Sequence, residues 1–227
     1  IHIAEQTGEV DACLAWSGQR PVQWLLNHAP VDARWCLVHA THMDAEEYRR
    51  AAQSSAVAGL CPTTEANLGD GLFDMPRWRD AGGAWGVGSD SHVCVNAAEE
   101  LMLLEYGQRL QFRQRNLLAT AQQPQVASAM WQQAVQGGAH ASGRAASGRA
   151  TGQRADFCVL DGSHIALAGL DAPDMLSAHV FASHRSSALE EVWVGGQPVT
   201  RHGSRHPLHE QAALAFTQAR AALIHQA

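Results

Sequence analysis

The apolar residues in the first part of the chain fall into four short runs, at residues 1–5, 35–39, 57–62 and 85–90. Short apolar runs are typical of buried strands, and the longer stretches between these runs have helical character. The alternation of strand and helix predicts an α/β fold. Each run ends at a residue that can bind a metal, transfer a proton or turn sharply. This is informative because parallel α/β proteins carry their chemistry at the C-terminal ends of strands.

Two of the intervening stretches have helical patterns. Residues 44–54 are polar and Ala-rich, and residues 97–115 place Leu101, Leu104 and Leu110 at helical spacing with Glu and Arg on the other face. An amphipathic helix buries such an apolar stripe, so these leucines are predicted to lie in the core.

The last third of the chain changes in composition. Residues 137–153 are rich in Gly, Ala, Ser and Arg, which by composition predicts a linker. The elements predicted after it are a strand at 154–161, a hairpin of strands at 191–194 and 197–200, and a helix at 208–224. Gly195 and Gly196 predict the tight turn of that hairpin, because glycine adopts the positive φ that such turns need.

The residues at the strand ends form a candidate site for metal-dependent hydrolysis. His2 projects from a strand, and Glu5 follows just past its end, so Glu5 can curl over the mouth of the site. His39 ends the second run, and Asp90 ends the fourth. His42 competes with His39 for one role, but it lies in the predicted loop after the strand. This set of side chains suits a reaction in which a metal is held and protons are moved.

At these residues the chain resembles the amidohydrolase superfamily, the metal-dependent TIM-barrel hydrolases and deaminases. His2 and Glu5 are similar to the strand-five metal ligand and proton-shuttle Glu of its deaminase branch. His39 is similar to the strand-six His, and Asp90 to the strand-eight Asp. The resemblance implies that His2 and Asp90 bind one divalent metal. It also implies that Glu5, His39 and Asp90 are catalytic. Zinc is the expected metal, and iron(II) or manganese(II) also suit such donors.

Two longer runs make the resemblance narrower. Residues 61–71 and 99–110 are similar to the branch of the superfamily that acts on N-formimino-L-glutamate in histidine degradation. This implies hydrolytic deimination of that small molecule, which carries carboxylates, to N-formyl-L-glutamate and ammonia. Two alternatives stay open. One is another deaminase of the superfamily, acting on guanine or a thioadenosine, and the other is a non-catalytic half that needs its N-terminal complement.

The resemblance covers the second part of such an enzyme. The family's strand-one His-x-His, which supplies two further metal ligands, does not occur in this sequence. We therefore expect the C-terminal half of a TIM-like (β/α)8 barrel over residues 1–136. Residues 137–227 are expected to hold a return segment, part of a small β-sandwich domain and a C-terminal helix. The resemblance favours residues 137–153 as the turn from the barrel into that β-domain over the linker that composition predicts.

Composition and charge argue against several classes of partner. The formal net charge of −6 does not suit a nucleic-acid surface or an anionic membrane surface, which would need a basic patch. No apolar stretch approaches the length of a membrane span. The five Cys residues form no Cys-x-x-Cys pair, so reduced thiols and a cytoplasmic location are expected. A homodimer is the expected assembly.

Two groups of residues each keep two interpretations. Thr64, Glu65 and Asn67 either line the pocket or cap the following helix, where Thr and Asn can satisfy free backbone N–H groups. Arg109 either pairs with a substrate carboxylate or forms a surface pair with Glu105, four residues earlier on the same helix. The pair with Glu105 is favoured.

Overall fold

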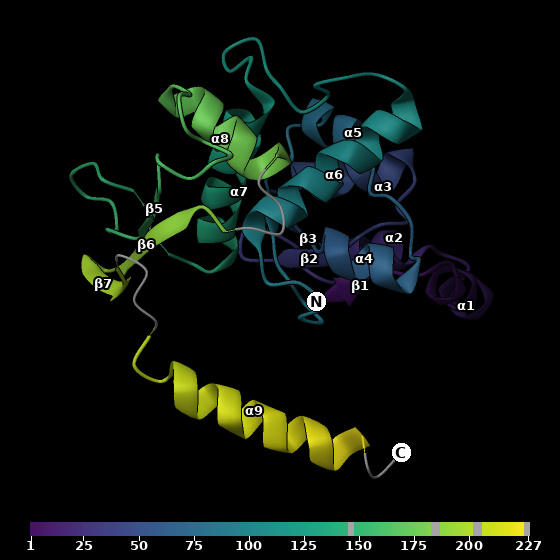
Figure 1. Cartoon of the computed structure of the whole chain (residues 1–227). Coiled ribbons are helices and arrows are strands. Elements are labelled where there is room, and N and C mark those ends of the chain that lie inside the picture. Colours follow the sequence, from purple (N-terminus) through teal and green to yellow (C-terminus); the bar gives the residue numbers. More distant parts are fainter. Residues whose placement is uncertain (145–147, 183–186, 202–205, 225–227) are drawn as a thin grey trace.

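A computed structural model describes residues 1–144, 148–182, 187–201 and 206–224 (Figure 1). The chain begins with a four-stranded sheet whose strand order is β1-β2-β3-β4 and in which all neighbours run parallel. The strands are β1 (His2–Ile3), β2 (Cys36–His39), β3 (Val57–Leu60) and β4 (Trp85–Val87). The four predicted strands are therefore confirmed, as is an α/β fold with a parallel sheet.

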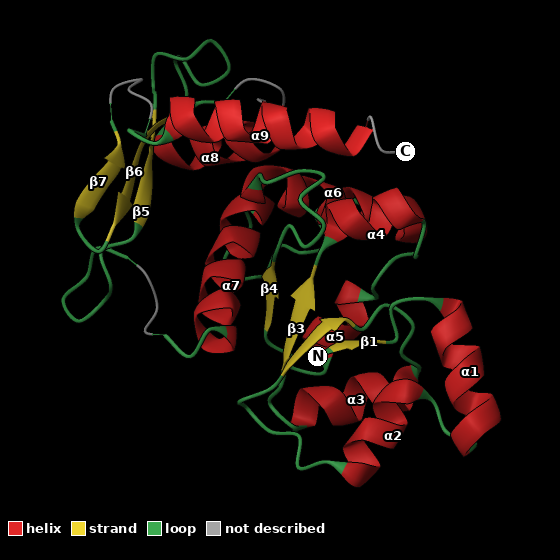
Figure 2. Cartoon of the chain, turned by 90° about the horizontal axis from the view of Figure 1, so that it is seen from below, coloured by secondary structure: helices red, strands yellow, loops and turns green. Residues whose placement is uncertain are grey.

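Helices connect consecutive strands, because a parallel pair needs a long crossover. They are α1 (Thr7–Ser17), α2 (Pro21–His28), α3 (Ala45–Gln53), α4 (Pro62–Leu68) and α5 (Met75–Asp80), with α6 (Ala97–Phe112) and α7 (Val126–Ala141) after β4. Figure 2 shows α2 and α3 along one side of the sheet and α7 beside β4. The helix predicted at 44–54 is confirmed as α3. Asp44 caps it by accepting hydrogen bonds from the backbone N–H groups of Glu46 and Glu47.

An aromatic cluster anchors the segment between α4 and α5. Tyr48 of α3, Phe73 and Trp78 of α5 pack edge to face, with ring centroids 5.2 to 6.3 Å apart. All three side chains are buried, so the cluster belongs to the main core. The Tyr48 hydroxyl also accepts a hydrogen bond from the backbone N–H of Asp74, at 2.8 Å. The chain that follows α4 is thereby held close to the sheet.

Helix α7 packs directly on β4 through glycine. A Cβ atom on Gly137 would lie 1.8 Å from the carbonyl oxygen of Trp85, and one on Gly86 would lie 3.0 Å from the backbone nitrogen of Gly138. A side chain at Gly137 would therefore collide with the strand backbone. These glycines serve close helix–strand packing.

The prediction of a linker from residue 137 is wrong for residues 137–141, which form the end of α7. The composition misled because glycine is common both in linkers and where two backbones touch. Residues 148–153 form bends and turns, and residues 145–147 of the predicted linker lie outside the described residues. The expected domain boundary between residues 136 and 137 falls inside α7, and that division of the chain stays a prediction.

Helix α6 is shorter than predicted and buries only part of its leucine stripe. It ends at Phe112 because Arg113 adopts the left-handed conformation, with φ of 55°. Leu101 and Leu104 are buried as predicted, but Leu110 is 79% exposed. The core assignment of Leu110 is therefore wrong, since this residue lies in the last turn, where the helix leaves the core.

The second part of the chain forms a three-stranded antiparallel sheet in the order β5-β6-β7. Its elements are β5 (Phe157–Leu160), α8 (Ala172–Phe181), β6 (Leu189–Val194) and β7 (Gln197–Thr200). The predicted hairpin is confirmed, with φ of 58° at Gly195 and 76° at Gly196. Figure 1 shows α8 above α7 and to one side of this sheet. Membership of a β-sandwich stays a prediction.

The last described helix is α9 (His209–Ile224), which confirms the predicted C-terminal helix. None of its described residues is buried, and Figure 1 shows it set apart from both sheets. Within the described ranges, we find no helix with both the length and the apolar character needed to cross a membrane.

Candidate active site

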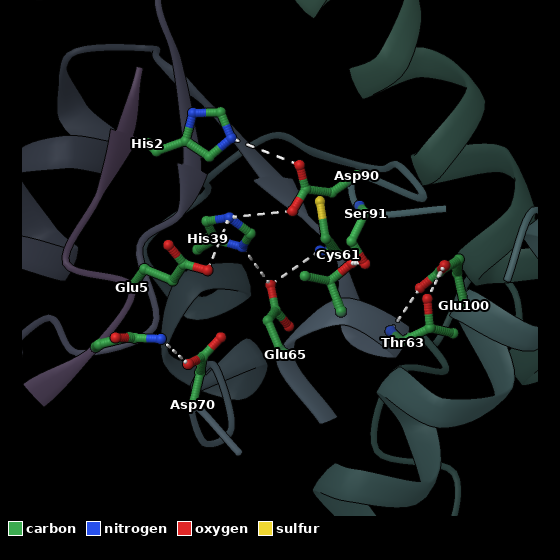
Figure 3. Close-up of polar contacts among 12 residues, drawn as sticks. His2, Glu5, His39, Cys61, Thr63, Glu65, Asp70, Asp90, Ser91 and Glu100 are labelled. Carbon is green, nitrogen blue, oxygen red and sulfur yellow. Dashed lines mark hydrogen bonds and ion pairs between the residues drawn. The ribbon is translucent and has the colours of Figure 1, made fainter. Parts of the chain in front are cut away.

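Four predicted residues meet at the C-terminal ends of β1, β2 and β4 (Figure 3). His2 Nε2 lies 3.6 Å from Asp90 Oδ1. His39 Nε2 lies 3.5 Å from Glu5 Oε1 and 3.8 Å from Asp90 Oδ2. The rings of His2 and His39 are 5.2 Å apart between centroids. Residues from three separate strands thus face one small volume, as the strand-end pattern predicted.

The backbone makes an unusual turn where three of these strands end. Ala4, His39 and Asp90 have φ values of 50°, 64° and 44°, in the left-handed region that non-glycine residues rarely adopt. Such conformations cost free energy and persist where the surrounding structure enforces them. At these positions they turn the chain from the strand direction at the site itself.

Glu9 holds the turn that carries Glu5. Its carboxylate accepts hydrogen bonds from the backbone N–H groups of Ala4, at 2.8 Å, and Glu5, at 2.9 Å. Glu9 lies in the first turn of α1, where a negative charge also favours the helix. The sequence analysis did not identify Glu9. Its signal was a Glu four residues after Glu5, which is too common to single out.

Glu65 belongs to the site and is not only a helix cap. Its Oε1 lies 3.2 Å from His39 Nδ1 and accepts a hydrogen bond from the backbone N–H of Cys61, at 2.9 Å. The Glu65 and His39 residues are only 4% and 0% exposed. Glu65 therefore holds the His39 ring at Nδ1, while Nε2 faces Glu5 and Asp90.

Thr64 and Asn67, the two residues that the sequence analysis grouped with Glu65, differ in their surroundings. The Thr64 hydroxyl donates to the backbone carbonyl of Ser89, at 3.1 Å, and lies 2.9 Å from the Ser91 hydroxyl. It therefore links the start of α4 to the loop that carries Asp90. Asn67 is exposed.

The two longer runs that carry the family resemblance meet in space. Glu100, in α6, accepts hydrogen bonds from the Thr63 backbone N–H at 2.9 Å and the Thr63 hydroxyl at 2.6 Å. Within the second run, Arg109 Nε donates to Glu105 at 2.8 Å, which confirms the favoured pairing. It is not a surface pair, because Glu105 is buried and also accepts from the backbone N–H of Leu118.

The His42 side chain makes its hydrogen bond to the loop after α4 and not to one of the four site residues. Its Nε2 donates to the backbone carbonyl of Asp70, at 2.7 Å. His39 therefore takes the site position for which the two histidines competed, and His42 fixes the neighbouring loop.

The charges at the site change the proton affinity of two side chains. Burial raises the pKa of Glu5; His39 opposes this effect, and the carboxylates of Asp70 and Asp90 reinforce it. Burial by itself would lower the pKa of His39, but the hydrogen bond that its Nδ1 donates to Glu65 and the negative charges of Glu5, Glu65 and Asp90 raise it overall. Both side chains therefore hold a proton more readily than they would in water.

The donor atoms at the site suit a divalent metal. One atom each from His2, His39 and Asp90 lies within 4.8 Å of the others. Within the part of the chain that the structure describes, the buried His39 Nε2 has no hydrogen-bond partner, although a buried imidazole nitrogen normally has one. Two imidazole nitrogens and one carboxylate oxygen are donors that zinc accepts. The sequence analysis assigned His2 and Asp90 as ligands and His39 to catalysis.

The chain belongs to the amidohydrolase family, whose model matches residues 1–199. It is 49% identical over 218 residues to formimidoylglutamate deiminase of Pseudomonas aeruginosa, and the alignment covers 96% of this chain and 48% of that enzyme. It is 29% identical over 196 residues to 8-oxoguanine deaminase of the same organism, covering 86% of this chain and 42% of that enzyme. The resemblance inferred from the sequence is confirmed. The chain spans about half the length of these curated relatives.

Two solved structures have a similar fold over the length of this chain. An amidohydrolase from Brucella melitensis matches 99% of this chain and 49% of its own, with a TM-score of 0.91 and 46% identity. An adenosine deaminase from Xanthomonas campestris, solved with bound zinc, matches 100% of this chain and 50% of its own, with a TM-score of 0.84 and 20% identity. At that lower identity the likeness concerns the fold alone. The described chain thus matches half of an amidohydrolase structure.

Proposed function

We propose that the full-length protein hydrolyses N-formimino-L-glutamate to N-formyl-L-glutamate and ammonia, in histidine degradation. The observation that carries the proposal is the approach of Glu5 and Asp90 to the same nitrogen of His39, at 3.5 and 3.8 Å. Acid–base groups packed this closely suit a hydrolysis in which a proton must pass from water to a leaving nitrogen. The 49% identity to formimidoylglutamate deiminase supports the choice of substrate.

In this proposal, residues 1–136 form the second half of a (β/α)8 barrel. The order of the four parallel strands, each next to its neighbour in sequence, suits a barrel segment. Residues 137–227 would supply the return segment, strands of a small β-sandwich and the C-terminal helix. A cytoplasmic location fits the five free cysteines. A homodimer stays a prediction.

His2 and Asp90 would hold one divalent metal together with ligands outside this chain, and zinc is the ion we favour. A bound divalent ion supplies Lewis acidity, which lowers the pKa of water toward neutrality. Iron(II) or manganese(II) would suit the same donors. His39 Nε2 is close enough to His2 and Asp90 to be a further metal ligand or to bind the reacting groups.

The side chains of this chain would then divide the proton transfers. Asp90 would accept a proton from the attacking water. Glu5 would deliver a proton to the departing nitrogen, which has to leave as ammonia because the amide anion is far too basic. The raised pKa of Glu5, which burial causes, favours this donation. His39, fixed by Glu65, would direct a hydrogen bond at the charge that develops on the reacting carbon's substituents.

Ammonia release by the full-length protein tests this proposal. The panel would hold N-formimino-L-glutamate, a neutral formimino compound, guanine and methylthioadenosine. We expect N-formimino-L-glutamate to be preferred over the neutral formimino compound by several orders of magnitude, because a site built to pair a charge rejects an analogue that leaves the charge unpaired. Guanine deamination without activity on N-formimino-L-glutamate would reject the substrate but not the metal site.

A further inference from the structure

Asp70 is a buried carboxylate within an exposed loop. The residues around it, 66–69 and 71–72, are exposed, whereas Asp70 itself is 7% exposed. Gly69 and Gly71 have φ values of 75° and 124°, so the chain turns sharply on both sides. These turns bring a single side chain inward from a loop that otherwise faces solvent.

The backbone of Asp70 is fixed in this position. Its N–H donates to the carbonyl of Glu65 at 2.9 Å, and its carbonyl accepts from His42 Nε2 at 2.7 Å. A Cβ atom on Gly71 would lie 3.4 Å from the His42 ring, so the loop packs tightly there. The inward direction of Asp70 is therefore part of the fold.

One oxygen of the Asp70 carboxylate has a partner and the other has none. Oδ1 accepts a hydrogen bond from Gln6 Nε2 at 2.9 Å, whereas the buried Oδ2 makes no hydrogen bond. A buried carboxylate oxygen without a donor is costly, and native structures rarely leave one. Among the described residues, Oδ2 is therefore the side-chain oxygen of Asp70 that the fold leaves without a protein donor.

Asp70 faces the same region as the catalytic carboxylates. Figure 3 shows it beside Glu5 and Glu65, on the side of His39 that is away from His2. The negative charge of Asp70 also contributes to the raised pKa of Glu5, after the effects of burial and His39. The carboxylates gathered here are Glu5, Glu65, Asp70 and Asp90. They outnumber the two imidazoles, so the site favours a cation.

We infer that Asp70 Oδ2 accepts a hydrogen bond from the cationic amidine of the substrate, and that Asp70 selects this charge over a neutral group. The inference rests on the proposed function. An amidine is a strong base and is protonated at neutral pH, whereas the formamide group of the product is neutral. A hydrogen bond between two charged groups is roughly twice as strong as one between neutral groups. Asp70 would therefore bind substrate more tightly than product. Conversion of the cationic amidine to the neutral formamide would then favour product release.

The test compares Asp70→Asn with the parent full-length holoenzyme. Asn keeps the size of the side chain and can still accept the Gln6 hydrogen bond, but it lacks the charge. We expect KM for N-formimino-L-glutamate to rise by about 10- to 100-fold. The Kd of N-formyl-L-glutamate, measured by calorimetry, should change by less than about threefold, because a neutral ligand loses little from the change. The melting temperature should not fall, since the variant no longer buries a negative charge and its amide oxygen can keep the Gln6 hydrogen bond.

The matched control is Asp74→Asn. Asp74 caps α5 by accepting from the backbone N–H of Arg77, at 3.0 Å, and pairs with the Arg77 side chain. Asn can keep the cap, and the partly exposed pair contributes little, so the melting temperature should stay close to that of the parent and the ratio of substrate KM to product Kd should be unchanged. If Asp70→Asn does not fold, Asp70→Ser provides the same comparison with a smaller side chain.

The outcomes separate the two claims. An enzyme that releases no ammonia from N-formimino-L-glutamate rejects the proposed function and this inference with it. An active parent enzyme whose Asp70→Asn variant keeps the ratio of KM to product Kd rejects the inference alone. A fall in kcat at unchanged KM also rejects it, because Asp70 would then act on the chemical step and not on charge recognition.

Discussion

The Nδ1 atom of His39 lies 3.2 Å from Oε1 of Glu65, and both residues are buried. The same Glu65 oxygen accepts the backbone N–H of Cys61, which fixes its position at the start of α4. Because one ring nitrogen of His39 is held, the other is directed at Glu5 and Asp90. Glu65 thus sets the orientation of the His39 ring relative to Glu5 and Asp90.

Replacing Glu65 should therefore affect catalysis through His39. We expect Glu65→Gln to lower kcat/KM by roughly 10- to 100-fold, as is typical when the partner of a site histidine is changed. Glu65 is one of the groups that raise the pKa of His39, so its neutralisation lowers that pKa. The limb of the pH profile of kcat/KM that reports His39 should then move to lower pH.

The control for this prediction is Glu46→Gln, an exposed Glu on α3 that pairs with Arg49. It should leave both the rate and the pH profile unchanged, because an exposed pair contributes little. A pH profile that stays in place in Glu65→Gln would argue that the two side chains are not coupled.

Metal binding and proton transfer should be separable at the site. Asp90→Ala in the full-length enzyme should reduce both metal content and rate, because a ligand is lost. Glu5→Gln should retain the metal and lose turnover by roughly 100-fold or more, the size typical of lost acid–base catalysis. Metal content by mass spectrometry and the rate of ammonia release measure the two effects. Turnover of Glu5→Gln at the parent rate would remove Glu5 from the proposed mechanism.

The Cys61 thiol should be unreactive in the folded protein. Burial, reinforced by the carboxylates of Glu65, Asp90 and Glu100, raises the pKa of Cys61 to about 12. The thiolate is the nucleophile, so almost none is present at pH 8. Iodoacetamide followed by peptide mass spectrometry should leave Cys61 unmodified in the native protein and label it in urea. Rapid labelling under native conditions would show that this side of the site is open.

The position of the site could be predicted from the sequence, because parallel strands bring their C-terminal ends to one edge. That rule alone placed His2, His39 and Asp90 together, although they are far apart in sequence. The left-handed conformations of Ala4 and Asp90 could not be predicted, since alanine very rarely adopts positive φ and aspartate does so only occasionally. They depend on tertiary contacts.

Long-range partners were also beyond the sequence. Glu65 satisfied a helix-cap pattern, and only the fold shows that the same carboxylate reaches His39, 26 residues away. Asp70 was part of a recognised run, but its burial follows from the turn at Gly69 and Gly71. The Gly-rich composition around Gly137 suggested a linker. Its packing on Trp85 is a tertiary contact that composition does not encode.

The adjacent glycines of α7 should respond to substitution in opposite directions. A Cβ on Gly137 would meet the backbone oxygen of Trp85 at 1.8 Å, whereas one on Gly138 would have no atom within 4 Å. Gly137→Ala should therefore lower the free energy of unfolding by about 1–3 kcal/mol or more, since a strand backbone cannot move aside as a side chain can. Gly138→Ala should raise it by about 0.5–1 kcal/mol, because alanine loses less conformational entropy in a helix. Urea unfolding followed by circular dichroism measures both values in the full-length protein. A stabilising Gly137→Ala would contradict the close packing of α7 on β4, and with it the structural reason for glycine at this position.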